Sequence, residues 1–97
     1  MRNYSLTRLA EWDLRAIARH TFKRYGALQS REYMQGLLDC FQLLTSDPSL
    51  GRKCESILPG LRGIEYDSHV FFYTTEADRV VVSRILPRQI IPAAARD

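Results

Sequence analysis

Apolar and small residues recur at three- and four-residue steps over the first quarter of the chain. The positions are Ala10, Leu14, Ile17, Ala18, Thr21, Phe22 and Tyr25. This spacing places them on one face of an α-helix. Thr7 is a suitable N-cap, Glu11 and Asp13 lie near the positive end of the helix, and Gly26 is a suitable C-terminal stop. The pattern predicts a first helix that begins after Thr7 and buries this face.

A second periodic stretch covers residues 28–44. Its apolar face consists of Tyr33, Met34, Leu37, Leu38, Phe41 and Leu44. Gly36 in its middle either costs about 1 kcal/mol relative to alanine or marks the close approach of a neighbouring segment. Because only a short loop at Gly26 separates the two helices, they are predicted to form an antiparallel hairpin. Pro48 ends the second helix, and residues 48–59 are interpreted as an irregular connector.

The second half of the chain changes to strand-like patterns rich in aromatic and β-branched residues. The predicted strands cover residues 61–66, 69–75 and 80–86, with turns at 67–68 and 76–78. Residues 3–6 are compatible with a first short strand. Pro87 cannot donate to a strand ladder, so it closes the last strand or lies at its edge. Residues 87–97 are interpreted as a C-terminal tail.

The order of these elements predicts a single α+β domain over residues 1–97. An N-terminal strand is followed by a two-helix antiparallel hairpin, which packs on a mostly antiparallel sheet with a three-stranded C-terminal meander. One face of the sheet is expected to bury the apolar face of the hairpin, because neither layer hides its apolar side alone. The other face and the tail are expected to remain open to a partner.

Alternation along the middle strand places His69, Phe71 and Tyr73 on one face, and Val70 and Phe72 on the other.

Alternation along the last strand places Arg84 on one face with Val80, Val82 and Leu86. A guanidinium among valines is rarely buried without a partner. Two interpretations stay open for Arg84. It forms a structural ion pair with Glu65, or it binds an anion such as phosphate or carboxylate.

The net charge of +3, from 14 Lys and Arg against 11 Asp and Glu, permits a nucleic-acid or an acidic protein partner. A cationic cluster at one edge of the sheet would consist of Arg52, Lys53, Arg62, Arg84 and Arg88. It either binds RNA or an acidic protein, or is an ordinary solvated rim. No apolar run approaches the roughly 20 residues of a membrane span, and the N-terminus lacks a signal-peptide core. A cytoplasmic protein is therefore expected.

Neither the cysteines nor the histidines form a recognisable site. Cys40 and Cys54 are isolated, and with His20 and His69 they do not show the paired spacing of a zinc site. Cys40 falls in step with the second helix and is interpreted as a core residue. His69 follows a predicted turn without a Ser-His-Asp constellation, and no Gly-rich phosphate loop is present. No catalytic residue, metal or cofactor is expected.

Four segments together resemble the RelE/ParE toxin superfamily, and the ParE branch is the closer match. They are LTRLAEWDLRAI, LLTSDPSLGR, LPGLRGIEYDSHVFFY and VVVSRIL, which keep the order and approximate spacing of the family over about residues 6–86. The resemblance implies a toxin of a bacterial type II toxin–antitoxin system, which the C-terminal segment of a cognate antitoxin wraps and neutralises. The usual target of ParE-type toxins is DNA gyrase. No direct nucleic-acid partner or membrane partner is expected.

The resemblance also supplies an alternative, a ribosome-dependent mRNA endonuclease of the RelE type. Such enzymes typically carry a tyrosine or histidine after the last strand, whereas here nothing aromatic follows Tyr73 and no histidine follows His69. This departure favours action by binding rather than by catalysis. The candidates for the alternative ribonuclease are Arg52, Lys53, Arg62, Tyr73 and Arg84.

The resemblance and the exposed positions predict two binding surfaces. The target-binding candidates are Arg62, Arg84, Arg88, Ile90 and Ile91. The antitoxin-binding candidates are Leu9 and Trp12, which lie off the main apolar face of the first helix. An alternative for Trp12 is packing against the first strand.

Overall fold

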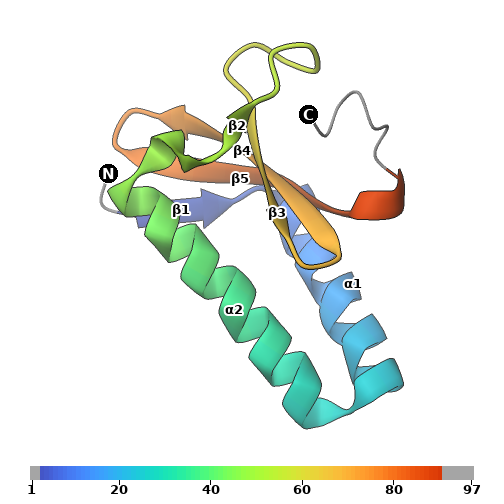
Figure 1. The fold of residues 1–97 in the computed structure, drawn as a ribbon. Coiled ribbons are helices and arrows are strands. Elements are labelled where there is room, and N and C mark those ends of the chain that lie inside the picture. Colours follow the sequence, from blue (N-terminus) through green and yellow to red (C-terminus); the bar gives the residue numbers. More distant parts are fainter. Residues whose placement is uncertain (1–2, 91–97) are drawn as a thin grey trace.

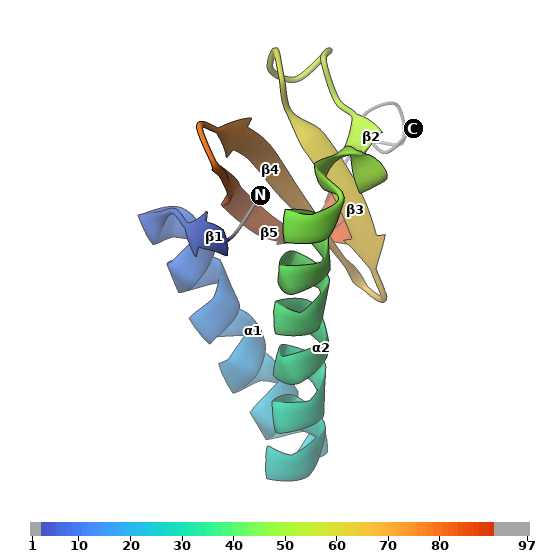
Figure 2. The same cartoon turned by 90° about the vertical axis from the view of Figure 1, so that its left-hand side faces the viewer.

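The structure, a computed structural model, describes residues 3–90. Its elements are β1 (Asn3–Leu6), α1 (Arg8–Tyr25), α2 (Ala27–Ser46), η1 (Pro48–Leu50), β2 (Arg52–Lys53), β3 (Arg62–Tyr66), β4 (His69–Glu76), β5 (Arg79–Pro87) and η2 (Arg88–Ile90). The α1–α2 hairpin packs on one face of the sheet and projects beyond it (Figures 1 and 2). Within the described range no helix combines the length and apolar character needed to cross a membrane.

The five strands form one sheet in the order β1-β5-β4-β3-β2. β1 is parallel to β5, and the other neighbours are antiparallel. The predicted α+β class, the helical hairpin and the C-terminal meander are confirmed. β2 lies in the stretch that was interpreted as an irregular connector. The sequence did not indicate it, because a strand of only two residues has no alternation to detect.

The predicted start and end of the first helix are confirmed. The Thr7 side chain accepts a hydrogen bond from the Ala10 backbone N–H, and Gly26 has φ of 95° at the C-cap. The predicted buried face is wrong at its C-terminal end, because Phe22 and Tyr25 are 58% and 62% exposed. They belong to the last turn of α1, and this end of the hairpin extends past the sheet (Figure 2).

The main core lies between the hairpin and the sheet. It consists of Ala10, Ile17, Leu37, Phe41, Leu44, Phe71, Tyr73, Val80, Val82 and Ile85. Phe41 of α2 and Phe71 of β4 meet edge to face, with ring centroids 4.9 Å apart. A Cβ atom on Gly36 would collide with the Tyr66 hydroxyl, so Gly36 marks a close approach of α2 and β3. Cys40 packs against this core, as predicted.

The opposite face of the sheet is not left open as expected. Cys54 and Leu61, at the two ends of the β2–β3 connection, form a second cluster with Val70 and Phe72 of β4. Leu86 packs against it. The predicted division of β4 into two faces is therefore confirmed, but each face has an apolar cover of its own.

A shift in register between β4 and β5 changes which residues of β5 face the helices. Phe72 lies opposite Arg84, whereas Tyr73 lies opposite Val82, so Ser83 is an extra residue. Before this bulge Val82 faces the main core, and after it Ile85 does. The prediction that Arg84 shares a face with Val82 is therefore wrong.

Candidate partner-binding surfaces

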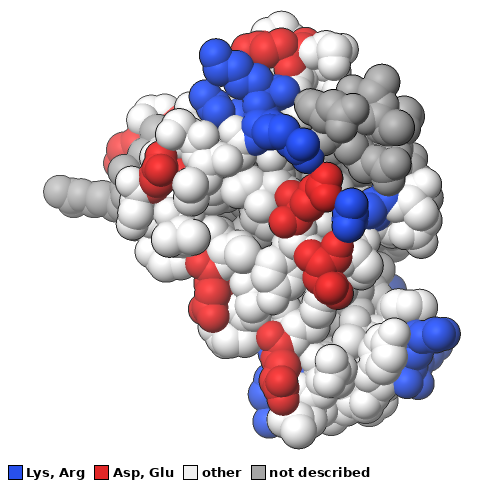
Figure 3. Space-filling model, viewed as in Figure 1, with Lys and Arg blue, Asp and Glu red and all other residues white. Residues whose placement is uncertain are grey.

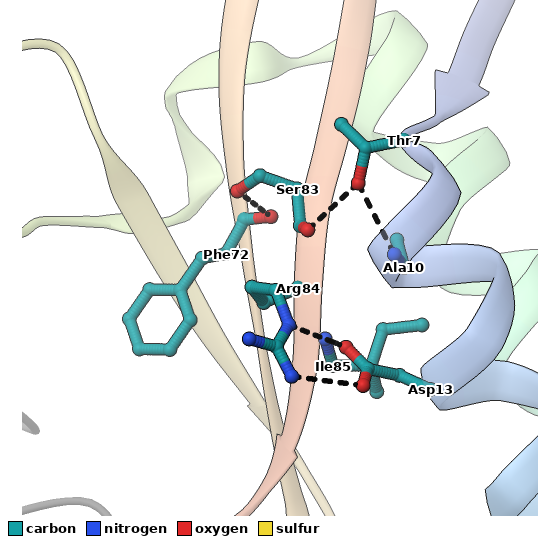
Figure 4. A network of polar contacts seen from close by, with 7 residues as sticks. All are labelled: Thr7, Ala10, Asp13, Phe72, Ser83, Arg84 and Ile85. Carbon is teal, nitrogen blue, oxygen red and sulfur yellow. Dashed lines mark hydrogen bonds and ion pairs between the residues drawn. The ribbon is translucent and has the colours of Figure 1, made fainter.

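The edge of β5 beyond the bulge is covered by the start of α1 rather than by a strand. β1 pairs only with residues 79–82 of β5. Past that point the Thr7 backbone N–H donates to the Val82 carbonyl at 3.0 Å, and the Thr7 hydroxyl donates to the Ser83 carbonyl at 2.8 Å. The Ile85 N–H donates to Asp13 Oδ2 at 2.9 Å (Figure 4). Thr7, the N-cap of α1, and Asp13 within α1 thus satisfy backbone groups that a sheet edge would expose.

Asp13 also holds the guanidinium of Arg84. Arg84 Nε lies 2.8 Å from Oδ2 and Nη2 lies 3.0 Å from Oδ1, a bidentate ion pair (Figure 4). The Asp13 side chain is 10% exposed and that of Arg84 is 41% exposed. The hydrogen bond that Arg84 donates to Asp13 raises the pKa of Arg84 and keeps its charge fixed. The structural interpretation of Arg84 is correct, but its predicted partner Glu65 is wrong, because the edge of β5 meets α1 and not β3.

Glu65 instead joins two other arginines. Its Oε1 lies 3.0 Å from Arg52 Nη2 and its Oε2 lies 2.9 Å from Arg88 Nη2. The Arg88 backbone N–H also donates to the Ser68 carbonyl at 3.0 Å. Residues 88–90 form the 3-10 helix η2, and these contacts attach it to β3 and to the β3–β4 turn. This stretch was predicted to be a tail. Residues 91–97, and with them the candidate Ile91, lie outside the described range.

The predicted cluster of five cations is divided between two places. Arg52 and Lys53 of β2 lie beside Arg62 of β3, where Lys53 is the register partner of Arg62. Arg88 joins them through Glu65, whereas Arg84 is bound to α1. Arg62 Nη1 donates to the Gly51 carbonyl at 2.7 Å, so its guanidinium is held against the connector. Figure 3 shows Lys and Arg side chains gathered over this end of the molecule, next to acidic ones.

Tyr73 is fully buried and is the register partner of Arg62 on the neighbouring strand. Its hydroxyl donates to the Pro48 carbonyl at 2.6 Å and accepts from the Gly51 N–H at 2.8 Å. Burial raises the pKa of the Tyr73 phenol. The side chain that was the aromatic candidate for ribonuclease chemistry thus anchors the connector between α2 and β2.

His69 is half-buried at the start of β4. Its Nδ1 lies 2.7 Å from the Tyr33 hydroxyl and 3.3 Å from that of Ser68. Burial lowers the pKa of His69, the neighbouring His20 lowers it further, and Asp67 opposes the shift. The two histidines line one hollow with Asp13. Among residues 3–90 no group of three or more His, Cys, Asp or Glu side chains has the geometry of a metal site.

Leu9 and Trp12 are exposed on the outer side of α1, at 56% and 64%. Together with Arg8, Glu11 and Arg15 they line a shallow hollow. The alternative interpretation, in which Trp12 packs against the first strand, is wrong at this degree of exposure. An exposed tryptophan and leucine three residues apart on a helix are typical of a protein-binding surface.

Comparisons with known proteins give one consistent result. Residues 4–92 match the family described as the ParE toxin of type II toxin–antitoxin systems, parDE. Toxin ParE1 of Mycobacterium tuberculosis strain H37Rv is 30% identical over 88 residues, which covers 90% of each chain. Toxin ParE1 of Caulobacter vibrioides is 31% identical over 86 residues, 89% of this chain and 88% of that one.

A solved structure shares the fold. The chromosomal ParDE TA system from P. aeruginosa contains a chain that superposes with a TM-score of 0.77 at 21% identity, over 90% of this chain and 96% of that one.

Asp13→Asn is expected to lower the free energy of unfolding by about 2–3 kcal/mol, because it weakens three hydrogen bonds and leaves Arg84 without its carboxylate. Urea denaturation followed by circular dichroism measures this change. Asp78→Asn, in an exposed turn, is the matched control and should change stability by no more than about 0.5 kcal/mol. Equal effects of the two substitutions would contradict the role given to Asp13.

Acidification is expected to destabilise the protein through His69. Its pKa in the folded state lies below the ordinary value of about 6.5, so the unfolded chain binds the proton more readily. This contribution is fully present above about pH 6.5 and is lost as the pH falls from there through the folded-state pKa. Urea titrations at pH 5 to 8 should show a steeper loss for the wild type than for His69→Asn. Parallel profiles for the two proteins would exclude His69 as the cause.

Proposed function

Because the chain belongs to the ParE toxin family of type II toxin–antitoxin systems, we propose that it inhibits DNA gyrase by binding in the bacterial cytoplasm. The family match over residues 4–92 carries this proposal, since it covers the described fold from the second residue of β1 to the end of η2. A cognate antitoxin neutralises the toxin, because the C-terminal segment of the antitoxin wraps around the toxin.

The burial and the hydrogen bonds of the candidate acid–base side chains support action by binding without catalysis. The Tyr73 hydroxyl is buried and makes two hydrogen bonds to the backbone. Arg84 is held by Asp13 through both Nε and Nη2. His69, the remaining titratable candidate, is half-buried against Tyr33. A ribosome-bound RNA would find no nucleophile-activating constellation among these side chains.

The target-binding surface in this proposal is the end of the molecule where β2, β3 and η2 meet. Arg62 and Arg88 are oriented there by the Gly51 carbonyl and by Glu65. Ile90, the last residue of η2, follows directly. Orientation of arginines by fixed acceptors lowers the conformational entropy that binding would otherwise cost. Arg84 acts in this proposal by holding α1 to β5.

One observation favours the alternative function. Arg52 and Lys53 are exposed beside Arg62, and such a basic group fits an RNA backbone as well as an acidic protein. The ribosome-dependent mRNA endonuclease therefore remains the second candidate, with Arg52, Lys53 and Arg62 as its phosphate-binding residues.

The antitoxin-binding surface in this proposal is the hollow around Leu9 and Trp12. Beside these two apolar side chains the hollow is lined by Arg8, Arg15 and Glu11, a net positive charge, so a segment with apolar side chains and flanking carboxylates would complement it.

Purified protein is expected to inhibit supercoiling by gyrase on plasmid DNA and to leave mRNA intact on translating ribosomes. Arg62→Gln combined with Arg88→Gln should raise the half-inhibitory concentration about tenfold, since each loses a solvent-exposed charge contact with the target. Arg79→Gln, at the far end of β5, is the control. Cuts in ribosome-bound mRNA at defined codon positions, without an effect on gyrase, would refute the proposal in favour of the endonuclease.

Trp12→Ala is expected to weaken binding of the antitoxin encoded beside the toxin gene by about 30-fold, as for a central aromatic anchor. The inhibition of gyrase should not change. Leu43→Ala, which removes a leucine of similar exposure (58%) from α2, is the matched control. Isothermal titration calorimetry measures the affinity. An unchanged affinity of Trp12→Ala would place the antitoxin elsewhere.

A further inference from the structure

The tip of the helical hairpin carries large apolar side chains on its outside. Phe22, Tyr25 and Leu28 are 58%, 62% and 65% exposed, and they fall within seven consecutive residues. Phe22 and Tyr25 lie three residues apart on α1 and so share one side of the helix. The tip projects beyond the sheet at the opposite end of the hairpin from η1 and β2 (Figure 2).

The inside of the tip is closed by small polar residues instead. Thr21 is buried, and its hydroxyl donates to the Ile17 carbonyl at 2.7 Å. Ser30 is also buried, and its hydroxyl donates across the hairpin to the Ala18 carbonyl at 3.0 Å. These contacts let α1 and α2 approach closely at the tip. The helices are therefore joined there without the large side chains, which remain free to contact another molecule.

The tip is held in one shape. Gly26 is the single residue between the helices, and its φ of 95° is one that other residues rarely adopt. Its N–H donates to the Phe22 carbonyl at 2.9 Å, and its carbonyl accepts from the Ser30 N–H at 3.1 Å. The Arg24 guanidinium lies 5.7 Å above the Tyr25 ring and its Nε is 3.2 Å from the Tyr25 hydroxyl. A backbone fixed in this way loses little conformational entropy when the tip binds.

The charges around the tip indicate what kind of partner fits. Residues 19–32 contain the exposed cations Arg19, Lys23, Arg24 and Arg31, against the single exposed carboxylate Glu32. A complementary surface has an apolar recess bordered by carboxylates. A second copy of the chain is disfavoured, because contact between two tips would bring like charges together.

We propose that the hairpin tip is an anchor that inserts Phe22, Tyr25 and Leu28 into an acid-bordered apolar recess on the protein target of the toxin. This inference rests on the proposed function only for the identity of that target as gyrase. In the proposed function the antitoxin binds the hollow around Leu9 and Trp12, about 20 Å along α1 from Tyr25, and antitoxin binding at the tip is an alternative that the test below distinguishes. The tip thus provides a second point of contact for the target, in addition to the arginines of β3 and η2.

The test uses the full-length double variant Phe22→Ala with Tyr25→Ala. Both side chains are exposed, so its thermal unfolding and its affinity for the antitoxin are expected to match the wild type. Its affinity for gyrase should fall about 30-fold, and its expression in cells should no longer arrest growth. Leu43→Ala is again the matched control and should arrest growth normally. A second variant, Lys23→Glu with Arg24→Glu, should weaken gyrase binding and reduce its dependence on salt.

Several results would overturn this inference. They are growth arrest by both tip variants at wild-type levels, loss of antitoxin binding in place of target binding, and a dimer of the wild type that the double variant cannot form. Binding of the wild type to phosphatidylglycerol vesicles, lost in the double variant while its gyrase affinity stays unchanged, would assign the tip to a membrane. A further outcome is growth arrest by the wild type without an effect on gyrase. If the tip variants then fail to arrest growth while Leu43→Ala still does, the gyrase proposal is refuted and the anchor proposal is supported.

Discussion

The attachment of α1 to the free edge of β5 is the contact on which the rest of the structure depends. Asp13 accepts three hydrogen bonds there, two from Arg84 and one from the Ile85 backbone N–H. A carboxylate that is 10% exposed is stable only with such partners. Because β1 pairs no further than Val82, this carboxylate replaces the missing strand and sets the position of α1 on the sheet. The direction of the hairpin, and with it every surface on α1, follows from this contact.

The side chains considered for catalysis bind other groups of the protein, whereas a different set of side chains is exposed to solvent. Tyr73 and Arg84 satisfy acceptors of the protein itself, and the half-buried His69 contacts Tyr33. The exposed positions instead include apolar side chains on both helices and cations of β2 and η2. A molecule built in this way offers rigid recognition surfaces on three sides, which is the physical form expected of an inhibitor that acts by binding.

The elements of the fold were largely predictable, but the site was predictable only in part. The period of about 3.6 in both helices and the two short turns of the meander are local signals, and they gave the correct class. The exposure of Leu9 and Trp12 also followed from their place off the buried face of α1. Strict alternation failed at Ser83, because a bulge inserts one residue without any change in residue type that marks it. Phe22 and Tyr25 were misassigned to the core because periodicity does not show where the sheet ends.

The sequence by itself determined what each segment becomes, since helix and strand patterns, caps and turns depend on neighbours a few residues apart. Only the tertiary structure decided the pairing of charges. Asp13 and Arg84 are separated by 71 positions, and Glu65 was an equally suitable partner for an arginine until the order of the strands placed it between Arg52 and Arg88. An ion pair depends on a few ångströms of separation, and that distance is set by packing and register rather than by composition.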